Sequence, residues 1–185
     1  MTSADDEATV WSLGDELAYS RRDIELPHFT FDVFDGGFFD EWSLLEMRQI
    51  SYRSRVGLLL SGWGEPGGYN AGLIVFDGVR AIRATGLSRP RELTAWIVGG
   101  TATVLTDETI EFSIGDMTQL ENEVAISCAR VEVRLGYSRE FATAPPDFVE
   151  ETPEGAMRAT PNWGAPFEAL YAAARTMSQV RENTN

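Results

Sequence analysis

Two short apolar runs, Val56-Gly-Leu-Leu-Leu-Ser61 and Leu73-Ile-Val-Phe76, are joined by the loop Ser61-Gly-Trp-Gly-Glu-Pro-Gly-Gly-Tyr-Asn-Ala-Gly72. Short apolar runs bounded by glycine are typical of buried strands, so we expect a strand on each side of the loop. Seven of the 22 residues from Gly57 to Gly78 are glycine. Because glycine has no Cβ, such a loop can turn tightly or approach another molecule closely. A nucleotide, a partner protein and ordinary hairpin geometry would each explain it.

Further strands are predicted on both sides of this segment. Residues 29–33 alternate apolar and polar side chains, and Asp77-Gly78 before residues 79–83 is typical of a type I′ hairpin. Residues 101–105, 109–114 and 124–135 are rich in Val, Ile, Thr and Phe. At the end of the last run, Glu132 and Arg134 alternate with apolar residues, which predicts one buried and one solvent-facing side.

Helical periodicity occurs near both ends of the chain. Residues 4–20 carry apolar side chains at helical spacing (Val10, Leu13, Leu17), and residues 166–181 do the same (Phe167, Leu170, Ala174, Met177). Ser88 and Pro90 could begin a third helix over 89–98. Residues 38–55 are ambiguous, because 41–47 could form a helical turn whereas 50–55 looks extended.

These patterns predict an α+β fold: a largely antiparallel β-sheet with an N-terminal and a C-terminal helix packed on it. A chain of 185 residues suffices for one hydrophobic core. We therefore expect a single globular domain over 1–185, in which the N-terminal tail 1–7 and the C-terminal tail 182–185 are flexible.

The net charge of −14 is unevenly distributed. Residues 1–46 hold 12 acids and two arginines, residues 47–99 hold three acids and seven arginines, and residues 100–185 hold 14 acids and six arginines. Such a chain should repel nucleic acid and anionic membranes and should attract basic proteins. Acidity that merely keeps the protein in solution is the alternative.

Composition also restricts the chemistry and the compartment. The chain has no lysine, which excludes Schiff-base catalysis and a P-loop lysine. Cys128 is the single cysteine, so an internal disulfide is impossible. The acidic N-terminus is unlike a signal peptide, and no apolar run approaches the length of a membrane span. We expect a cytoplasmic protein.

No catalytic motif emerges from the remaining residues. Gly62, Gly64 and Gly67 match the dinucleotide-binding spacing, but a strand follows where that motif requires a helix. His28 is the only histidine, and no nucleophile-elbow motif accompanies a serine. Cys128 lies within a predicted strand, which indicates a buried, inert thiol. We expect no catalytic residue, no cofactor and no metal site.

Acidic and aromatic residues alternate over residues 32–42. The acids are Asp32, Asp35, Asp40 and Glu41, and the aromatic residues are Phe34, Phe38, Phe39 and Trp42. The acids could bind a hard cation or form a solvated face, and the aromatic residues could belong to an interface or to the core. Arginines flank the glycine-rich loop and could bind an anion or pair with the abundant acids (Arg48, Arg53, Arg55, Arg80, Arg83).

The glycine-rich loop and the general acidity resemble the small immunity proteins with which actinobacteria neutralise secreted toxins. Among them, the chain is similar to the immunity factors of NAD-glycohydrolase toxins of the mycobacterial necrotizing type. The resemblance implies a protein that is not an enzyme and that binds one basic, secreted toxin in a 1:1 complex. It implies no nucleic-acid and no membrane partner.

If this resemblance holds, the loop would enter the toxin's active-site cleft and exclude its substrate. The expected partner-binding residues are Gly62, Trp63, Gly64, Glu65, Pro66, Gly67, Gly68, Tyr69 and Asn70. Trp63 and Tyr69 would be the affinity anchors. Two alternatives stay open: an acidic secretion chaperone that binds an extended segment, and a small enzyme or ligand-binding domain.

Overall fold

The computed structural model describes residues 12–19, 33–34, 37–62, 68–85, 96–106, 108–116, 123–139 and 163–177. One α-helix, α1 (Leu13–Tyr19), and one 3-10 turn, η1 (Ser51–Arg53), occur in this part of the chain. The nine strands are β1 (Ser43–Ile50), β2 (Arg55–Ser61), β3 (Ala71–Asp77), β4 (Ala81–Thr85), β5 (Trp96–Leu105), β6 (Ile110–Asp116), β7 (Glu123–Cys128), β8 (Arg130–Tyr137) and β9 (Glu168–Thr176). None of the described helices is long and apolar enough to cross a membrane.

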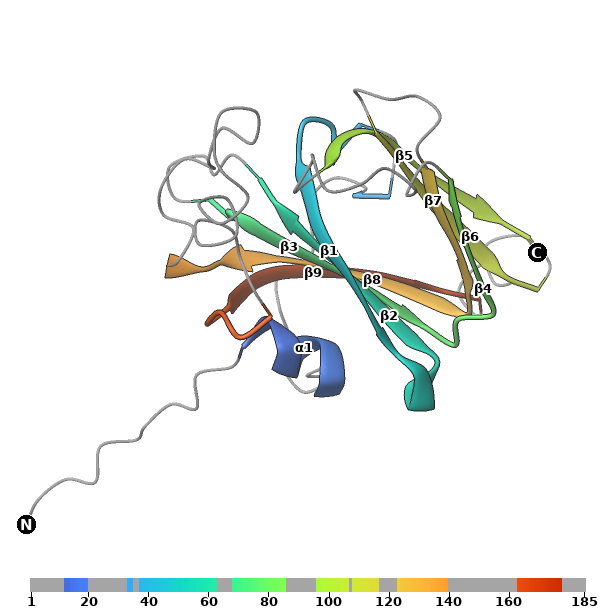
Figure 1. Ribbon diagram of the computed structural model, residues 1–185, viewed down its shortest axis with the longest axis horizontal. Helices are drawn as coiled ribbons and strands as arrows, with labels where there is room; N and C mark the ends of the chain where they lie inside the picture. The colour runs from blue at the N-terminus through green and yellow to red at the C-terminus, as the bar shows by residue number, and fades with distance from the viewer. Residues whose placement is uncertain are drawn as a thin grey trace, which may run out of the picture.

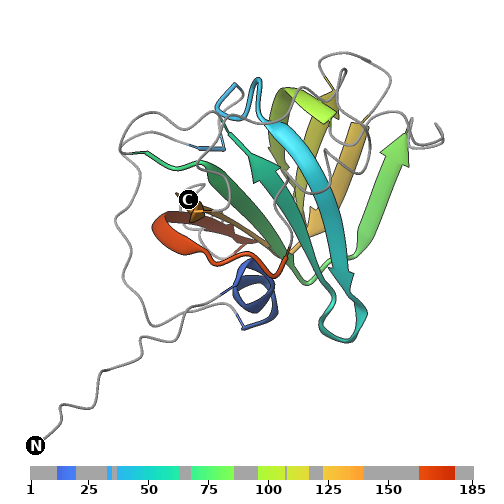
Figure 2. The same ribbon diagram turned by 60° about the vertical axis from the view of Figure 1, so that its left-hand side comes forward.

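The strands follow the order β4-β7-β6-β5-β1-β2-β3-β8-β9, with antiparallel neighbours throughout. At the centre of this order, β1 and β5 pair only through Ser43↔Ile97 and Leu44↔Trp96. The sheet folds over at this short junction into two layers, and α1 lies against the layer of β2, β3 and β8 (Figures 1 and 2). The fold is therefore a two-layer antiparallel β-structure.

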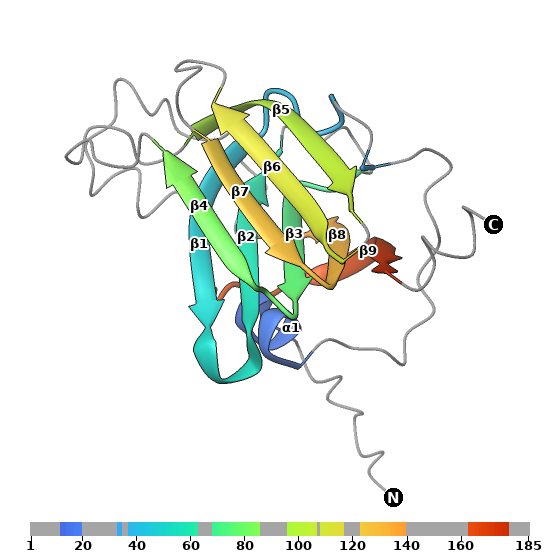
Figure 3. The same cartoon turned by 90° about the vertical axis from the view of Figure 1, so that its right-hand side faces the viewer.

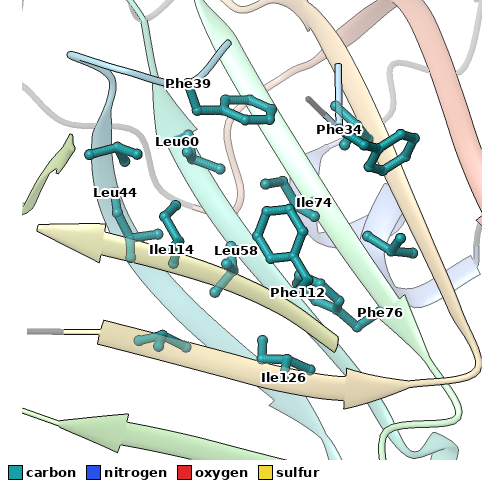
Figure 4. Packing of buried hydrophobic residues seen from close by; sticks show 14 of the residues in the cluster. Phe34, Phe39, Leu44, Leu58, Leu60, Ile74, Phe76, Phe112, Ile114 and Ile126 are labelled. Carbon is teal, nitrogen blue, oxygen red and sulfur yellow. The ribbon is translucent and has the colours of Figure 1, made fainter. Parts of the chain in front are cut away.

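The main core lies between the two layers. Leu58, Leu60, Ile74 and Phe76 of one layer face Phe112, Ile114 and Ile126 of the other (Figure 4). A second apolar cluster lies on the outer side of the first layer, where α1 and residues 163–167 cover it. Sheet faces buried on both sides explain why β2 and β3 are nearly continuous apolar runs.

The predicted α+β class with two terminal helices is wrong, because the protein is mainly antiparallel β-structure with one short helix among the described residues. Residues 168–176 of the C-terminal helix predicted over 166–181 form strand β9, which pairs with β8, and residues 178–181 lie outside the described part. Its alternate residues Tyr171 and Ala173 pack on the main core, whereas Ala169 packs on the second cluster. The alanines at 172–174 favour a helix, but pairing with β8 satisfies its backbone and overrides this propensity.

The N-terminal helix is confirmed only over Leu13–Tyr19, and residues 4–11 lie outside the described part. Ser12 and Asp15 cap it reciprocally: the Ser12 hydroxyl and amide donate to the Asp15 carboxylate, and the Asp15 amide donates to the Ser12 hydroxyl. These hydrogen bonds, led by the one from the Ser12 side chain, lower the pKa of Asp15. Of the predicted helix over 89–98, residues 96–98 belong to β5, and the rest is not described.

The predicted Asp77-Gly78 hairpin is also wrong. β3 pairs with β2 and β8, whereas β4 pairs with β7 in the other layer. Gly78 does have a left-handed φ of 62°, but its turn carries the chain from one layer to the other. Ala129 carries the chain back between β7 and β8, and its amide donates to the carbonyl of Asp77. The two crossings therefore lie side by side.

Two further expectations are corrected. Residues 43–50 form β1 and residues 51–53 form a 3-10 turn. The sequence had suggested the reverse order, with a helical turn over 41–47 and an extended segment over 50–55. The side of β8 predicted to face solvent is buried, with Glu132 and Arg134 only 5% and 3% exposed. The Arg134 guanidinium pairs with Glu132 on the same strand and with Glu16 of α1.

Candidate partner-binding site

The glycine-rich loop connects two paired strands. β2 and β3 are antiparallel neighbours from Arg55↔Asp77 to Ser61↔Ala71, so the loop joins the two strands of a β-hairpin. Residues 63–67, which include the predicted anchor Trp63, lie outside the described part. The site is therefore built from the base of the loop: Gly62, Gly68, Tyr69 and Asn70, and the residues around them.

The indole of Trp42 explains two of the glycines. A Cβ at Gly62 would lie 2.6 Å from the Trp42 ring, and a Cβ at Gly72 would lie 2.9 Å from it. Both distances are shorter than a non-bonded carbon contact allows, so the end of the β2–β3 hairpin needs glycine on both strands. Gly57 is explained similarly, since its Cβ would lie 2.7 Å from Leu17 of α1.

Five aromatic rings pack at this end of the molecule, and we call them the aromatic cluster: Phe38, Phe39, Trp42, Tyr69 and Tyr171. Trp42 and Tyr69 are stacked with ring centroids 5.9 Å apart, and Tyr171 meets Tyr69 edge to face at 6.1 Å. Phe39 and Trp42 are buried, whereas Phe38, Tyr69 and Tyr171 are half-buried. The cluster thus seals the core and leaves aromatic surface at the base of the loop.

Asn70 fixes the end of the loop to the end of β8. Its side-chain amide donates to the Ser138 carbonyl and its side-chain oxygen accepts from the Ser138 amide, both at 2.9 Å. The Asn70 amide donates to the Gly136 carbonyl, and the Asn70 carbonyl accepts from the Gly62 amide. Asn70 is only 6% exposed, so its side chain anchors the loop from within.

Exposed acids border the aromatic cluster. Asp40 and Glu41 lie in the turn between Phe39 and Trp42, and Glu168 begins β9 opposite Tyr137. Glu41 adopts a left-handed φ of 66°, which is uncommon for a residue with a side chain. Its amide donates to the Val98 carbonyl.

Three of the four aromatic residues of the predicted acidic and aromatic segment belong to the core, whereas Phe38 is half-buried and Asp40 and Glu41 are exposed. Phe34, Phe39 and Trp42 are all buried, and Phe34 lies under the Arg175 guanidinium. Asp32 and Asp35 fall outside the described residues. Among the residues that are described, no three acids, histidines or cysteines lie close enough to hold a metal ion.

The arginines around the loop are mostly engaged in ion pairs, as one of the two sequence interpretations held. Arg55 pairs with Asp77, Arg80 with Glu108, and Arg83 with Glu111. Arg48 pairs with Glu46 and also lies over the Trp163 ring. Arg53 donates to the Ala18 carbonyl at the end of α1.

Cys128 is confirmed as a buried thiol, and it packs in the main core. Desolvation raises its pKa to about 12. The thiol is therefore protonated at neutral pH, and a protonated thiol is a poor nucleophile. His28 lies outside the described residues.

Tyr171 and Ser138 were missed by sequence reasoning, although both hold the base of the loop. Tyr171 was assigned to a helix, and an isolated serine after a strand has no local signal for a hydrogen bond across 68 residues. Comparison with known proteins adds nothing to these assignments: no protein-family model, no curated protein and no solved structure matches the chain.

Proposed function

We propose that the protein is an immunity-type inhibitor that binds a basic, secreted toxin enzyme and blocks its active site with the glycine-rich loop. The observation that carries this proposal is how the loop is held at its base. Trp42 packs against Gly62 and Gly72, Tyr69 stacks on Trp42, and Asn70 is bonded to Ser138. A loop on a rigid base loses less conformational entropy on binding than one on a mobile base.

The charge of the chain and the aromatic surface near the loop indicate which kind of partner the protein binds. The exposed acids Asp40 and Glu41 lie between Phe39 and Trp42 of the aromatic cluster, and the exposed Glu168 lies on the same strand as Tyr171. Three rings of the cluster are half-buried, those of Phe38, Tyr69 and Tyr171. Aromatic residues supply most hot spots in protein interfaces, and acids accelerate the encounter with a basic partner. With a net charge of −14, the whole chain favours the same partner. An NAD-glycohydrolase is the toxin class that the sequence resemblance suggests.

The test is a binding and inhibition assay with the product of the neighbouring gene, which the proposal expects to be a basic, secreted enzyme. We expect a 1:1 complex by light scattering and loss of NAD hydrolysis on complex formation. Replacing Trp63 and Tyr69 together by alanine should weaken binding by more than ~1 kcal/mol, or about fivefold in Kd. Val104→Ala is the matched control, because Val104 is 55% exposed on β5 and lies outside the loop and its base.

Three outcomes would reject the proposal. An unchanged affinity of the Trp63 and Tyr69 double variant would exclude the loop as the inhibitory element. A dimer that binds an extended, unfolded segment would indicate a secretion chaperone. A rise in melting temperature with NAD, sugars or acyl compounds in the absence of protein partner would indicate a ligand-binding domain or an enzyme.

A further inference from the structure

Three charged residues are buried beneath α1, on the side of the layer of β2, β3 and β8 that faces away from β4, β6 and β7 (Figure 3). Glu16 of α1 is 2% exposed, and Glu132 and Arg134 of β8 are 5% and 3% exposed. The Arg134 guanidinium pairs with both carboxylates, and its Nε lies 2.7 Å from Glu132. We call these three residues the buried triad. Because charged side chains are rarely buried to this degree, their presence here needs a reason.

The neighbours of the triad on the sheet are apolar. On β3, Val75 pairs with Glu132 and Leu73 pairs with Arg134, and both belong to the second apolar cluster. Apolar residues would therefore be usual at these two positions of β8. Well-packed apolar residues of similar volume commonly give the same stability as buried ion pairs, or more, because burial removes the charges from water. Stability alone does not explain the triad.

Apolar contacts leave the orientation of α1 weakly specified. The helix has seven residues, of which Leu13 and Leu17 belong to the second apolar cluster. Apolar contact has no preferred direction, so two leucines tolerate a small rotation of the helix. The amides of Leu13 and Gly14 donate to the carbonyls of Ala165 and Trp163. These hydrogen bonds fix the first turn of α1, and the second half of the helix needs other contacts.

The second half of α1 is held by charged groups that lie on two different strands. From β8, Arg134 pairs with Glu16. From β2, the Arg55 guanidinium donates to the carbonyls of Leu17 and Ala18, at 2.8 and 3.3 Å. Ion pairs and hydrogen bonds depend on direction as well as on distance. Contacts on two strands therefore fix both the rotation of α1 and its position across the sheet.

Further ion pairs join these two contacts. Arg130 pairs with Glu132 at 2.6 Å and with Asp77 at 3.4 Å, and Asp77 pairs with Arg55. The connected charges thus begin at Glu16 on α1 and end at carbonyls near the C-terminal end of the same helix. A rotation of α1 would separate Glu16 from its partner on β8 while both stay buried. A buried charge without its partner is costly, so such a rotation is disfavoured.

We propose that the buried triad is a positioning device, which selects a single orientation of α1 on the sheet and adds no net stability over apolar residues in the same places. Orientations that separate the charges are disfavoured, whereas an apolar face would accept several. The triad thereby also fixes which side of α1 covers the second apolar cluster. The proposal concerns the docking of α1, so it does not depend on the proposed inhibitory function.

The test is a triple variant of the full chain, Glu16→Leu with Glu132→Leu and Arg134→Met, which replaces the triad by apolar residues of similar volume. We expect its melting temperature to equal or exceed that of the parent. We also expect more than one set of NMR signals for the amides of residues 15–19. Hydrogen exchange of these amides should become about tenfold faster, because the second half of the helix opens more often.

Comparison with Arg134→Met separates positioning from stability. The single variant should melt at a lower temperature than the parent, because it removes the cation that two buried carboxylates share. The triple variant should regain the melting temperature without regaining a single set of α1 signals. One sharp, parent-like set of α1 signals in the triple variant would overturn the proposal. A triple variant that melts below the parent, or that does not fold, would overturn it as well, since the triad would then add net stability.

The matched control removes an exposed ion pair. Arg83→Met with Glu111→Leu breaks a pair between β4 and β6 whose side chains are 68% and 37% exposed. The α1 signals of this double variant should stay those of the parent. The same change of the α1 signals in the triple variant and in the control would trace it to the loss of charge in general, and would overturn the proposal.

Discussion

Close packing requires glycine at particular positions near the end of the β2–β3 hairpin. Three glycines of this segment are required by neighbouring side chains, Gly57 by Leu17 and Gly62 and Gly72 by Trp42. A glycine-rich stretch therefore does not by itself indicate a bound phosphate. The contacts between each glycine and the side chains around it have to be known before a ligand is inferred.

Gly62→Ala should destabilise the protein by about 1–3 kcal/mol, because the added methyl overpacks against Trp42. Chemical denaturation followed by tryptophan fluorescence measures the change in the free energy of unfolding. Gly100→Ala is the control, since a Cβ at Gly100 would meet no atom within 4 Å. Its effect should stay within about 0.5 kcal/mol. Equal losses for both variants would show that the Trp42 contact does not set the cost.

The Cys128 thiol should resist alkylation in the native protein between pH 7 and 9, because its pKa is raised from 9.0 to about 12. The unfolded chain releases this proton at lower pH than the native protein does. Stability from this group is therefore complete below pH ~9 and declines as the pH rises toward ~12. The free energy of unfolding of the parent should fall more steeply above pH 9 than that of Cys128→Ala. Rapid labelling of the native thiol would contradict the burial.

At the scale of elements, α1 is attached to the sheet by charges as well as by Leu13 and Leu17. Buried ion pairs link Glu16, Arg134 and Glu132, and Arg130 joins Glu132 to Asp77. Asp77 in turn pairs with Arg55, which donates to the carbonyls of Leu17 and Ala18. The charges alternate in sign along this chain of contacts, so each buried ion has an opposite neighbour.

Arg134→Met should cost about 3–5 kcal/mol of stability, because it removes the guanidinium that the buried carboxylates of Glu16 and Glu132 share. Arg83→Met is the control, since it breaks an exposed ion pair and should cost about 0–1 kcal/mol. Thermal and denaturant unfolding measure both changes. A small loss for Arg134→Met would indicate that the ion pairs contribute little to holding α1 on the sheet.

At the scale of the whole molecule, the net charge of −14 should govern the rate of partner capture. For a basic partner, the association rate constant should fall at least tenfold between low and physiological salt, while the dissociation rate changes little. Loop variants should show the reverse pattern and act on dissociation. Stopped-flow and surface-binding kinetics at several salt concentrations separate the two. An association rate constant that does not depend on salt would show that the net charge does not accelerate binding, so that the acidity would serve solubility alone.

Much of the strand content follows from local sequence. The runs at 56–61 and 73–76 are strands because short, apolar, glycine-bounded segments bury both faces only in a sheet, and the same reasoning locates 101–105, 109–114 and most of 124–135. The ion pairs of the arginines were one of the two interpretations of those residues, and the burial of Cys128 was predicted from its position in a strand. The glycines of the sequence pointed to the loop as a candidate site. The residues that fix its base, Tyr171 and Ser138, could not be identified from the sequence.

The sequence by itself determined where the main strands lie, the hairpin between β2 and β3, and the acidity of the surface. Tertiary structure alone decided that residues 168–176 pair as a strand, that Asp77-Gly78 crosses between layers, and that Glu132 and Arg134 are buried. The physical reason is the range of the interactions. Apolar periodicity and turn propensity act over a few residues, whereas strand pairing and the burial of charge depend on partners far away in the chain.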